Sequence, residues 1–332
     1  MGRTRSEEIE LENSGTGELE KEKGKKMKYR ARKFLVAVIA VLCAVSVLAA
    51  GKLNVVSVYP DYGWLASQVG GDHVQVSVMA KGTQDPHFVD PKPSFLVDLH
   101  RADLVLVNGL QLEVGFLPPL LTQCGNGKIQ PGASGYIDLS NFIKPIEVPQ
   151  GGVDRSMGDI HPFGNPHYHL DPRNMVAIAR GLGNVFASAD PSHAEDYQKN
   201  AAATAASLDA LDAEMARALM PLSGEAVVAY HATLNYFFIH YGFTVVGFVE
   251  PKPGIKPSPT SMLELEKTMR DRKVKILIVE NYEDLKIAGK VSSDTGARLV
   301  EIPALTGGEP DVKTYPDLMR TIVRDLLAGS HG

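Results

Sequence analysis

Residues 190–221 read DPSHAEDYQKNAAATAASLDALDAEMARALMP, and this stretch decides how the rest of the chain is organised. It is rich in alanine, opens with the capping-type sequence Asp-Pro-Ser, and has no glycine or proline from Ser192 to Met220. These features predict one long helix. Roughly 28 helical residues extend about 42 Å, which is longer than a single α/β lobe needs. We therefore expect a rigid connector helix between two lobes.

Apolar, strand-like runs alternate with helical segments on both sides of this helix. Such alternation is typical of βαβ units with a parallel sheet. The sequence thus predicts an α/β protein of two lobes, each a mostly parallel sheet flanked by helices, joined by one long connector helix. The runs are LNVVSVY (53–59), VQVSVMA (74–80) and DLVLVNG (103–109) before it, and EAVVAYH (225–231), TVVGFVE (244–250), KILIVEN (275–281) and ARLVEI (297–302) after it.

The chain accordingly divides into four predicted regions. Residues 1–50 form an N-terminal extension and signal peptide, 51–189 the N-terminal α/β lobe, 190–221 the connector helix, and 222–332 the C-terminal α/β lobe. Within the first lobe, residues 125–166 are rich in Gly, Pro and polar residues and are expected to form a long loop, of the kind that usually serves a site.

Composition and charge narrow the classes of function. The chain has 332 residues, 44% of them hydrophobic and 22% charged, which is enough for two ordinary globular domains. The formal net charge is −5, but residues 1–33 hold 10 Lys/Arg against 7 Asp/Glu, so the chain beyond residue 50 carries about −8. An acidic surface repels a phosphate backbone and tolerates a small cation. We expect no nucleic acid as partner and favour a divalent metal.

Residues 34–50, FLVAVIAVLCAVSVLAA, form an uncharged apolar run that ends in small residues. Basic residues precede it, and this pattern is typical of a secretory signal peptide. We expect cleavage near Ala50 and a periplasmic product, although about 17 apolar residues are also the lower limit for a retained membrane anchor. The natural start is expected at Met27. The basic residues are Lys28, Arg30, Arg32 and Lys33.

The chain contains two cysteines, Cys43 and Cys124. Because Cys43 lies inside the signal peptide, Cys124 is left without a partner in the mature chain. We therefore expect no intramolecular disulfide, and the fold must be stabilised by its apolar core.

Three histidines follow turn-like sequences or a strand end that restrict their backbone. Two of them, His87 and His167, come directly after a proline, and His231 lies at the end of the predicted strand 225–231. A proline fixes its own φ near −65° and restricts its neighbour, so these imidazoles are partly positioned before any ligand arrives. Singly, each could equally be a surface or core-edge histidine. Together they indicate a metal site.

Five motifs, in this order, resemble the solute-binding proteins of zinc and manganese ABC transporters, the family that includes metal-binding adhesins. The resemblance covers about residues 53–327. It implies a two-lobed fold without catalysis, working as a monomer that captures one metal ion and delivers it to an ABC transporter membrane permease. The motifs are DPHFVDPKPS (85–94), ADLVLVNGLQLE (102–113), NPHYHLDP (165–172), YHATLNYFFIHYG (230–242) and ILIVEN (276–281).

The resemblance implies metal ligands at His87, His167 and His231, the third being histidine in zinc importers and glutamate in many manganese importers. The family's usual Asp after the last strand is missing, since Ala304 stands near that place. Glu280 lies at the carboxyl end of the predicted strand KILIVE (275–280), where open α/β sheets bind ligands, and we expect it to replace that Asp. Glu250 and a water molecule are the alternatives.

The donor set favours one metal over others. Three neutral imidazoles with one oxygen suit tetrahedral Zn²⁺, whereas Mn²⁺ prefers more oxygen ligands. We therefore expect that each chain binds one Zn²⁺ ion and that Mn²⁺ is less favoured than Zn²⁺. Copper, nickel and cobalt also accept imidazole, so availability contributes to the choice.

Several polar residues near the predicted ligands have open roles. His161 and His169 could attract metal transiently or bind it in place of another ligand, but solvated or packing side chains are the preferred interpretation. Asp90 and Asp171 could orient an imidazole or cap a helix. Glu113 is interpreted as a structural carboxylate.

A zinc hydrolase or lyase is the rival function, because three histidines and a water also form a catalytic zinc site. The sequence contains no His-Glu-x-x-His helix and no Gly-x-Ser-x-Gly elbow, and each histidine comes from a separate segment. We therefore expect that this protein is not an enzyme. An adhesin or metal chaperone with the same fold stays open, because a fold does not determine its partner.

Overall fold

The structure is a computed structural model that describes residues 25, 27–29, 32–33, 51–151, 161–250 and 254–330. These residues belong to two units, Met1–Gly51 and Lys52–Gly332. In the first unit residues 25, 27–29 and 32–33 are helical, and the predicted signal peptide at 34–50 lies outside the described residues. Among the described residues, no helix has the length and apolar character needed to cross a membrane. Everything below concerns the second unit.

The first sheet is parallel and has the strand order β2-β1-β3-β4. Its inner strands, β1 and β3, are short runs of apolar residues buried on both faces, as expected for a parallel sheet between helices. The strands are β1 (Leu53–Ser57), β2 (Val74–Val78), β3 (Leu104–Val107) and β4 (Tyr136–Asp138), and the accompanying helices are α2 (Pro60–Gly70), α3 (Pro93–Arg101), α4 (Leu117–Gln123) and α5 (Pro172–Ala189).

The second sheet repeats this arrangement with the order β6-β5-β7-β8, again parallel throughout. The central strand β7 is buried along its whole length. The strands are β5 (Ala226–Ala229), β6 (Thr244–Phe248), β7 (Ile276–Glu280) and β8 (Arg298–Ile302), and the helices are α7 (Asn235–Tyr241), α8 (Pro259–Asp271), α9 (Leu285–Thr295) and α10 (Tyr315–Ser330). Two four-stranded parallel sheets flanked by helices confirm the predicted fold class.

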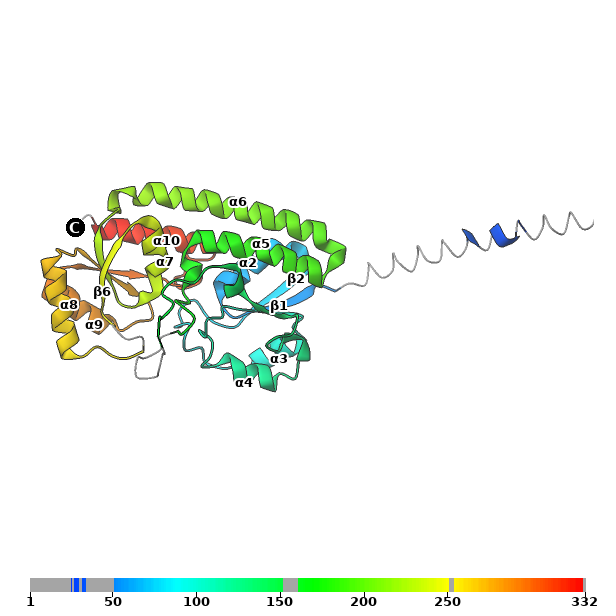
Figure 1. The fold of residues 1–332 in the computed structure, drawn as a ribbon, viewed down its shortest axis with the longest axis horizontal. Coiled ribbons are helices and arrows are strands. Elements are labelled where there is room, and N and C mark those ends of the chain that lie inside the picture. The colour runs from blue at the N-terminus through cyan, green and yellow to red at the C-terminus, as the bar shows by residue number, and fades with distance from the viewer. Residues whose placement is uncertain are drawn as a thin grey trace, which may run out of the picture. The chain divides into compact units, whose positions relative to one another are not determined.

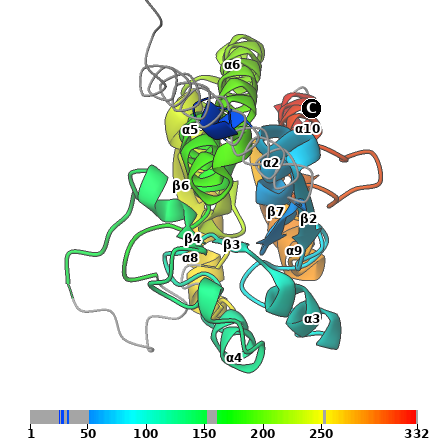
Figure 2. The same ribbon diagram turned by 90° about the vertical axis from the view of Figure 1, so that its right-hand side faces the viewer.

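The long helix predicted between the lobes is α6 (Ala194–Leu219), which has 26 residues and is flanked by short 3₁₀ turns at Pro191–His193 and Met220–Leu222. Its buried residues recur at about the helical period, as in Ala201, Ala205 and Leu208. This face packs against α5 and α2 beside the first sheet and against α10 beside the second (Figures 1 and 2). One continuous helix thus contacts both halves of the unit.

Buried hydrogen bonds connect the segments around the two sheets. The Asp61 carboxylate on α2 accepts hydrogen bonds from the Thr306 backbone N–H (3.2 Å) and hydroxyl (2.8 Å). The Tyr315 hydroxyl of α10 donates to the His169 carbonyl (2.7 Å). Beside them, Gly82 lies against the Thr306 and Gly307 backbone so closely that an added Cβ would come within 2.3 Å of both.

One apolar core extends across both sheets, and a smaller one lies between β7, α8 and α9. Because Lys52–Gly332 forms one compact unit, the division at 189/190 and 221/222 stays a prediction. Cys124 is buried and free, and it is the sole cysteine among the residues that the structure describes.

Candidate metal centre

His87, His167 and His231 converge at one point. One ring nitrogen from each lies within 4.8 Å of those of the other two. The ring centroids are 5.1 Å apart for His87 and His167, 5.3 Å for His167 and His231, and 5.5 Å for His87 and His231. Among the residues that the structure describes, these three histidines are the one group of at least three His, Cys, Asp or Glu side chains whose ligand atoms lie close enough together to hold a metal ion.

Each histidine is supplied by a segment at the carboxyl end of a strand or the start of a helix. His87 lies between β2 and α3, His167 precedes α5, and His231 follows β5 directly. Loops at the carboxyl ends of parallel strands form the usual ligand sites of open α/β sheets. The convergence therefore places a candidate site where the two sheets present their loops to each other.

The His87 ring is held by the carboxylate of Asp85. Asp85 Oδ1 accepts hydrogen bonds from the His87 backbone N–H (2.8 Å) and from Nδ1 (2.7 Å). Burial raises the pKa of Asp85, but these bonds from His87 outweigh that effect and hold it below its usual value. With Nδ1 occupied, Nε2 faces the other histidines and has no hydrogen-bond partner among the described residues. A carboxylate on the far nitrogen is the usual support of a metal-binding imidazole.

The two inner histidines are more deeply buried. His167 is 1% exposed and His231 is 5% exposed. Burial, together with the neighbouring His87, lowers the pKa of His231 to about 3 and that of His167 well below the usual value. Both nitrogens of His167 lack a hydrogen-bond partner within the described part of the chain. Neutral imidazoles with free lone pairs are the form that binds a metal.

Glu280 is the last residue of β7, as the sequence predicts, and is fully buried. Neither carboxylate oxygen meets a hydrogen-bond partner in the described residues. Burial raises the pKa of Glu280 to about 7; the Thr233 hydroxyl opposes the shift without reaching hydrogen-bonding geometry. Glu280 is not in the group of mutually close nitrogens, so its carboxylate lies outside the three-histidine set. Glu250 Oε1 is 3.9 Å from His231 Nδ1.

A cavity of about 210 Å³ opens beside His87 and His231, and acidic side chains line much of it. Burial and the nearby Glu280 raise the pKa of Glu283 to about 8. The crowding of carboxylates suits a positively charged group, and one cationic side chain, Lys256, also lines the cavity. The acidic lining residues are Asp85, Glu250, Glu283 and Asp284.

The other residues singled out from the sequence have structural roles or lie elsewhere. His169 is buried, and its Nε2 bonds to the Ala304 carbonyl (3.0 Å), so its interpretation as a packing residue is confirmed and solvation is excluded. Asp171 caps α5 by accepting from the Arg173 N–H. Asp90 is exposed. Glu113 accepts hydrogen bonds from backbone N–H groups and is structural, as predicted.

Sequence reasoning missed Asp85 as the residue that orients an imidazole, because it considered only the acids that follow each histidine. The signal was present in the order Asp85-Pro86-His87. An Asp two residues before a backbone N–H commonly accepts a hydrogen bond from it in a turn, and this brings the carboxylate to the same residue's ring.

The two lobes and the histidines converging at their loops are features of the solute-binding class of transport proteins. The chain belongs to the family described as ZnuA, zinc-uptake complex component A, periplasmic, whose match covers residues 55–329. This is a family of solute-binding transport proteins and not of enzymes.

Individual relatives differ in the metal that they are named for. The chain is 26% identical over 299 residues to the zinc-binding lipoprotein AdcA of Streptococcus pneumoniae, covering 89% of the chain but 58% of that protein. It is 26% identical over 286 residues to the iron-binding protein YfeA of Yersinia pestis, covering 84% of the chain and 87% of YfeA.

Solved structures share the fold. A crystal structure of ZnuA superimposes with a TM-score of 0.68 at 22% identity, covering 83% of the chain and 98% of that structure. The structure of FpvC from Pseudomonas aeruginosa in complex with Mn²⁺ gives 0.64 at 22% identity, covering 84% of the chain and 98% of FpvC.

Proposed function

We propose that this chain captures a divalent transition metal, zinc before others, in the periplasm and delivers it to an ABC transporter membrane permease. The observation that carries the proposal is the convergence of His87, His167 and His231, in which His87 Nε2 and both His167 nitrogens are buried without a hydrogen-bond partner among the described residues. Buried polar atoms without partners are costly, and a bound metal ion offsets that cost.

The proposed nitrogen ligands are the three imidazoles, and Glu280 is proposed as an oxygen donor beside them. Its carboxylate is buried, unpartnered within the described residues and close to other acids, all of which favour a nearby cation. Glu250 and a water molecule are the competing oxygen donors. Three imidazoles with one oxygen favour Zn²⁺, while the relatives named for iron or manganese show why the metal must be tested on this chain.

Delivery requires the lobes to adopt at least two arrangements. Because α6 is continuous and packs on both halves, we propose a limited tilt of the lobes instead of a wide hinge closure. We further propose secretion through the signal peptide at residues 34–50 and function as a monomer, with lobes bounded at 189/190 and 221/222.

Single replacement of His87, His167 or His231 by alanine tests the site. Each variant should weaken zinc binding by more than the roughly 10–100-fold that loss of a supporting residue costs, because one of three nitrogen donors is removed. Affinity is measured by competition with a chromophoric chelator, and circular dichroism checks the fold. Metal analysis of protein purified without added metal, with titrations of Zn²⁺ and Mn²⁺, identifies the preferred ion. If all three variants keep wild-type affinity, the proposed site is wrong.

A further inference from the structure

We propose that His161 is an additional imidazole ligand of the ion held by His87, His167 and His231. The inference rests on the proposed function and deepens it, because it adds a nitrogen donor that the three-histidine site lacks. It concerns a residue between the first sheet and α5 that the capture mechanism so far leaves unused.

The first observation is the position of the His161 ring. It stacks on the His87 ring with centroids 5.4 Å apart and planes inclined by 27°. Its Nε2 atom is buried and has no hydrogen-bond partner among the described residues, as is also true of His87 Nε2 and both His167 nitrogens. Unsatisfied imidazole nitrogens are therefore found on three neighbouring rings.

The second observation concerns the other side of the His161 ring, where the Leu110 backbone carbonyl lies close to the ring. A carbonyl beside one ring nitrogen favours the proton on that nitrogen, so the remaining nitrogen, Nε2, keeps its lone pair. This tautomer, with a carbonyl beside the far nitrogen, is that of a metal-binding histidine.

The Leu110 carbonyl is presented by an unusual turn. Gly109, Leu110 and Gln111 are consecutive residues with φ of 78°, 53° and 66°. Left-handed backbone costs about 1–2 kcal/mol for a residue other than glycine and persists only where surrounding contacts hold it. Glu113 provides such contacts, since its carboxylate accepts hydrogen bonds from the Asn108 and Gly109 N–H groups.

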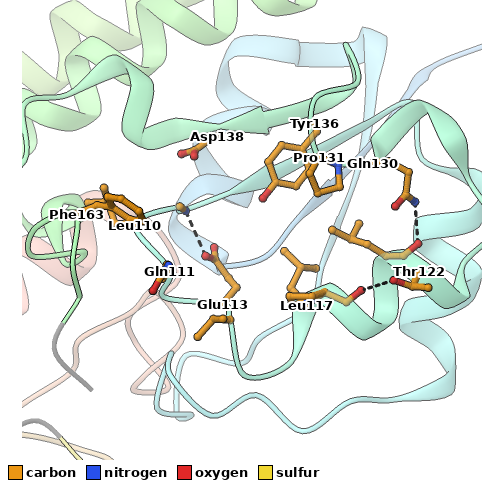
Figure 3. Close-up of a pocket in the computed structure, with 14 residues that line it drawn as sticks. Leu110, Gln111, Glu113, Leu117, Thr122, Gln130, Pro131, Tyr136, Asp138 and Phe163 are labelled. Carbon is orange, nitrogen blue, oxygen red and sulfur yellow. Dashed lines mark hydrogen bonds between the residues drawn. The ribbon is translucent and has the colours of Figure 1, made fainter. Parts of the chain in front are cut away.

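Figure 3 shows this turn at one edge of a cavity of about 400 Å³. Phe163, two residues after His161, lies beside Leu110, while Glu113 lies under the turn. The segment that carries His161 is therefore packed against the turn whose carbonyl lies close to the ring.

A purely structural histidine would be expected to satisfy its buried nitrogens, since burial without a partner costs free energy. His169 does so by bonding to the Ala304 carbonyl. His161 instead leaves one nitrogen unpaired next to two other unpaired imidazoles. Four imidazoles would favour zinc, copper, nickel or cobalt over Mn²⁺, which prefers oxygen ligands.

His161 lies outside the group of nitrogens within 4.8 Å of one another, so binding requires its ring to turn or shift towards the other three. The proposal is compatible with an oxygen from Glu280, because zinc takes four ligands and can expand to five. The number of imidazoles, not the affinity alone, is therefore the decisive quantity.

The test is zinc K-edge X-ray absorption on the zinc-loaded full chain and on H161Q, with zinc affinity measured by chelator competition. We expect four imidazoles in the wild type and three in H161Q, with affinity weakened about tenfold or more. The matched control is H100Q, because exposed His100 bonds a backbone carbonyl, that of Cys124, and does not belong to the group of converging histidines. It should leave both quantities unchanged.

Three imidazoles in both proteins, or an affinity of H161Q equal to that of H100Q, would overturn the inference. The proposed function is tested separately by the alanine variants at His87, His167 and His231. If those lose zinc while H161Q does not, this inference alone falls; if none loses zinc, both fall. Circular dichroism of H161Q confirms that any loss is local.

Discussion

At the scale of single residues, the site is built from pairs in which one side chain fixes another. The Asp85 carboxylate holds the His87 ring, and the Leu110 backbone carbonyl lies close to the His161 ring. The proline–histidine pairs and the strand end made His87, His167 and His231 identifiable from the sequence. The neighbouring residues Asp85 and Leu110 were not identifiable from the sequence. Asp85 depends on the direction of its side chain, and Leu110 lies in a left-handed turn without having the glycine that usually indicates one.

Replacing Asp85 by asparagine should weaken zinc binding by about 10–100-fold, the range for partners that support a metal-binding imidazole. The amide can still accept a hydrogen bond from His87 Nδ1, but the lost negative charge makes the imidazole a weaker donor to the metal. The measurement is competition with a chelator at fixed pH. Asp90→Asn is the matched control, since Asp90 is exposed and lies in the same segment. Equal affinities of the two variants would contradict this role for Asp85.

At the scale of elements, prolines and capping side chains mark where several helices begin. Helix α8, Pro259–Asp271, starts at a proline, and Ser258 caps it by accepting from the Ser261 N–H (3.1 Å). The end of α8 is harder to predict from the sequence, because Lys273 adopts the left-handed conformation (φ 52°) that is usually adopted by glycine. The Lys273 and Val274 N–H groups bond back to Arg270 and Met269 carbonyls, which is a Schellman ending.

Lys273→Gly should therefore raise the free energy of unfolding by about 0.5–1 kcal/mol. Left-handed backbone costs a non-glycine residue about 1–2 kcal/mol, and the greater freedom of glycine in the unfolded chain offsets part of that gain. Urea unfolding measures the difference. Lys267→Gly, at an exposed position inside the same helix, should instead lower the free energy of unfolding by about 1 kcal/mol. Destabilisation by Lys273→Gly would contradict the assignment of strain.

At the scale of the whole molecule, alternating strand and helix patterns were sufficient for the fold class, and the Ala-rich stretch for the long helix. The contacts that join the halves were not predictable, since Asp61 and Thr306 are 245 residues apart and each is unremarkable in its local sequence. The same holds for the three histidines as a set: their motifs indicate a site, but their mutual distances follow only from the packing of two sheets.

Buried ionisable groups should give the metal-free protein a pH-dependent stability with opposing contributions. The pKa of His231 is about 3 in the folded state and about 6.5 when unfolded, so between these values the unfolded chain binds more protons and acid destabilises the fold. The pKa of Glu280, raised to about 7 from 4.5, acts oppositely: its contribution is present below 4.5 and lost as pH rises through 7.

The prediction therefore concerns how steeply the free energy of unfolding changes with pH in two variants compared with the wild type. On acidification from pH 6.5 to 4.5, the free energy of unfolding of metal-free His231→Asn should fall less steeply than that of the wild type, by up to about 1.4 kcal/mol per pH unit. The free energy of unfolding of Glu280→Gln should fall more steeply than that of the wild type, because this variant lacks the stabilisation that protonation of Glu280 provides at acidic pH. Urea unfolding at several pH values measures both slopes. Identical slopes for wild type and His231→Asn would show that His231 is not buried in a neutral form.

The close approach of Gly82 to the Thr306–Gly307 backbone bears on how solvent reaches the centre of the molecule. At that point main chain meets main chain with no room for even a methyl group, and therefore none for a water molecule. The two segments are therefore in direct contact at that point. The cavity lined by Asp85, Glu250 and Glu283, and also by Lys256, lies beside the histidines instead, so a cation that entered through it would exchange hydration water for carboxylates on one side of the histidines.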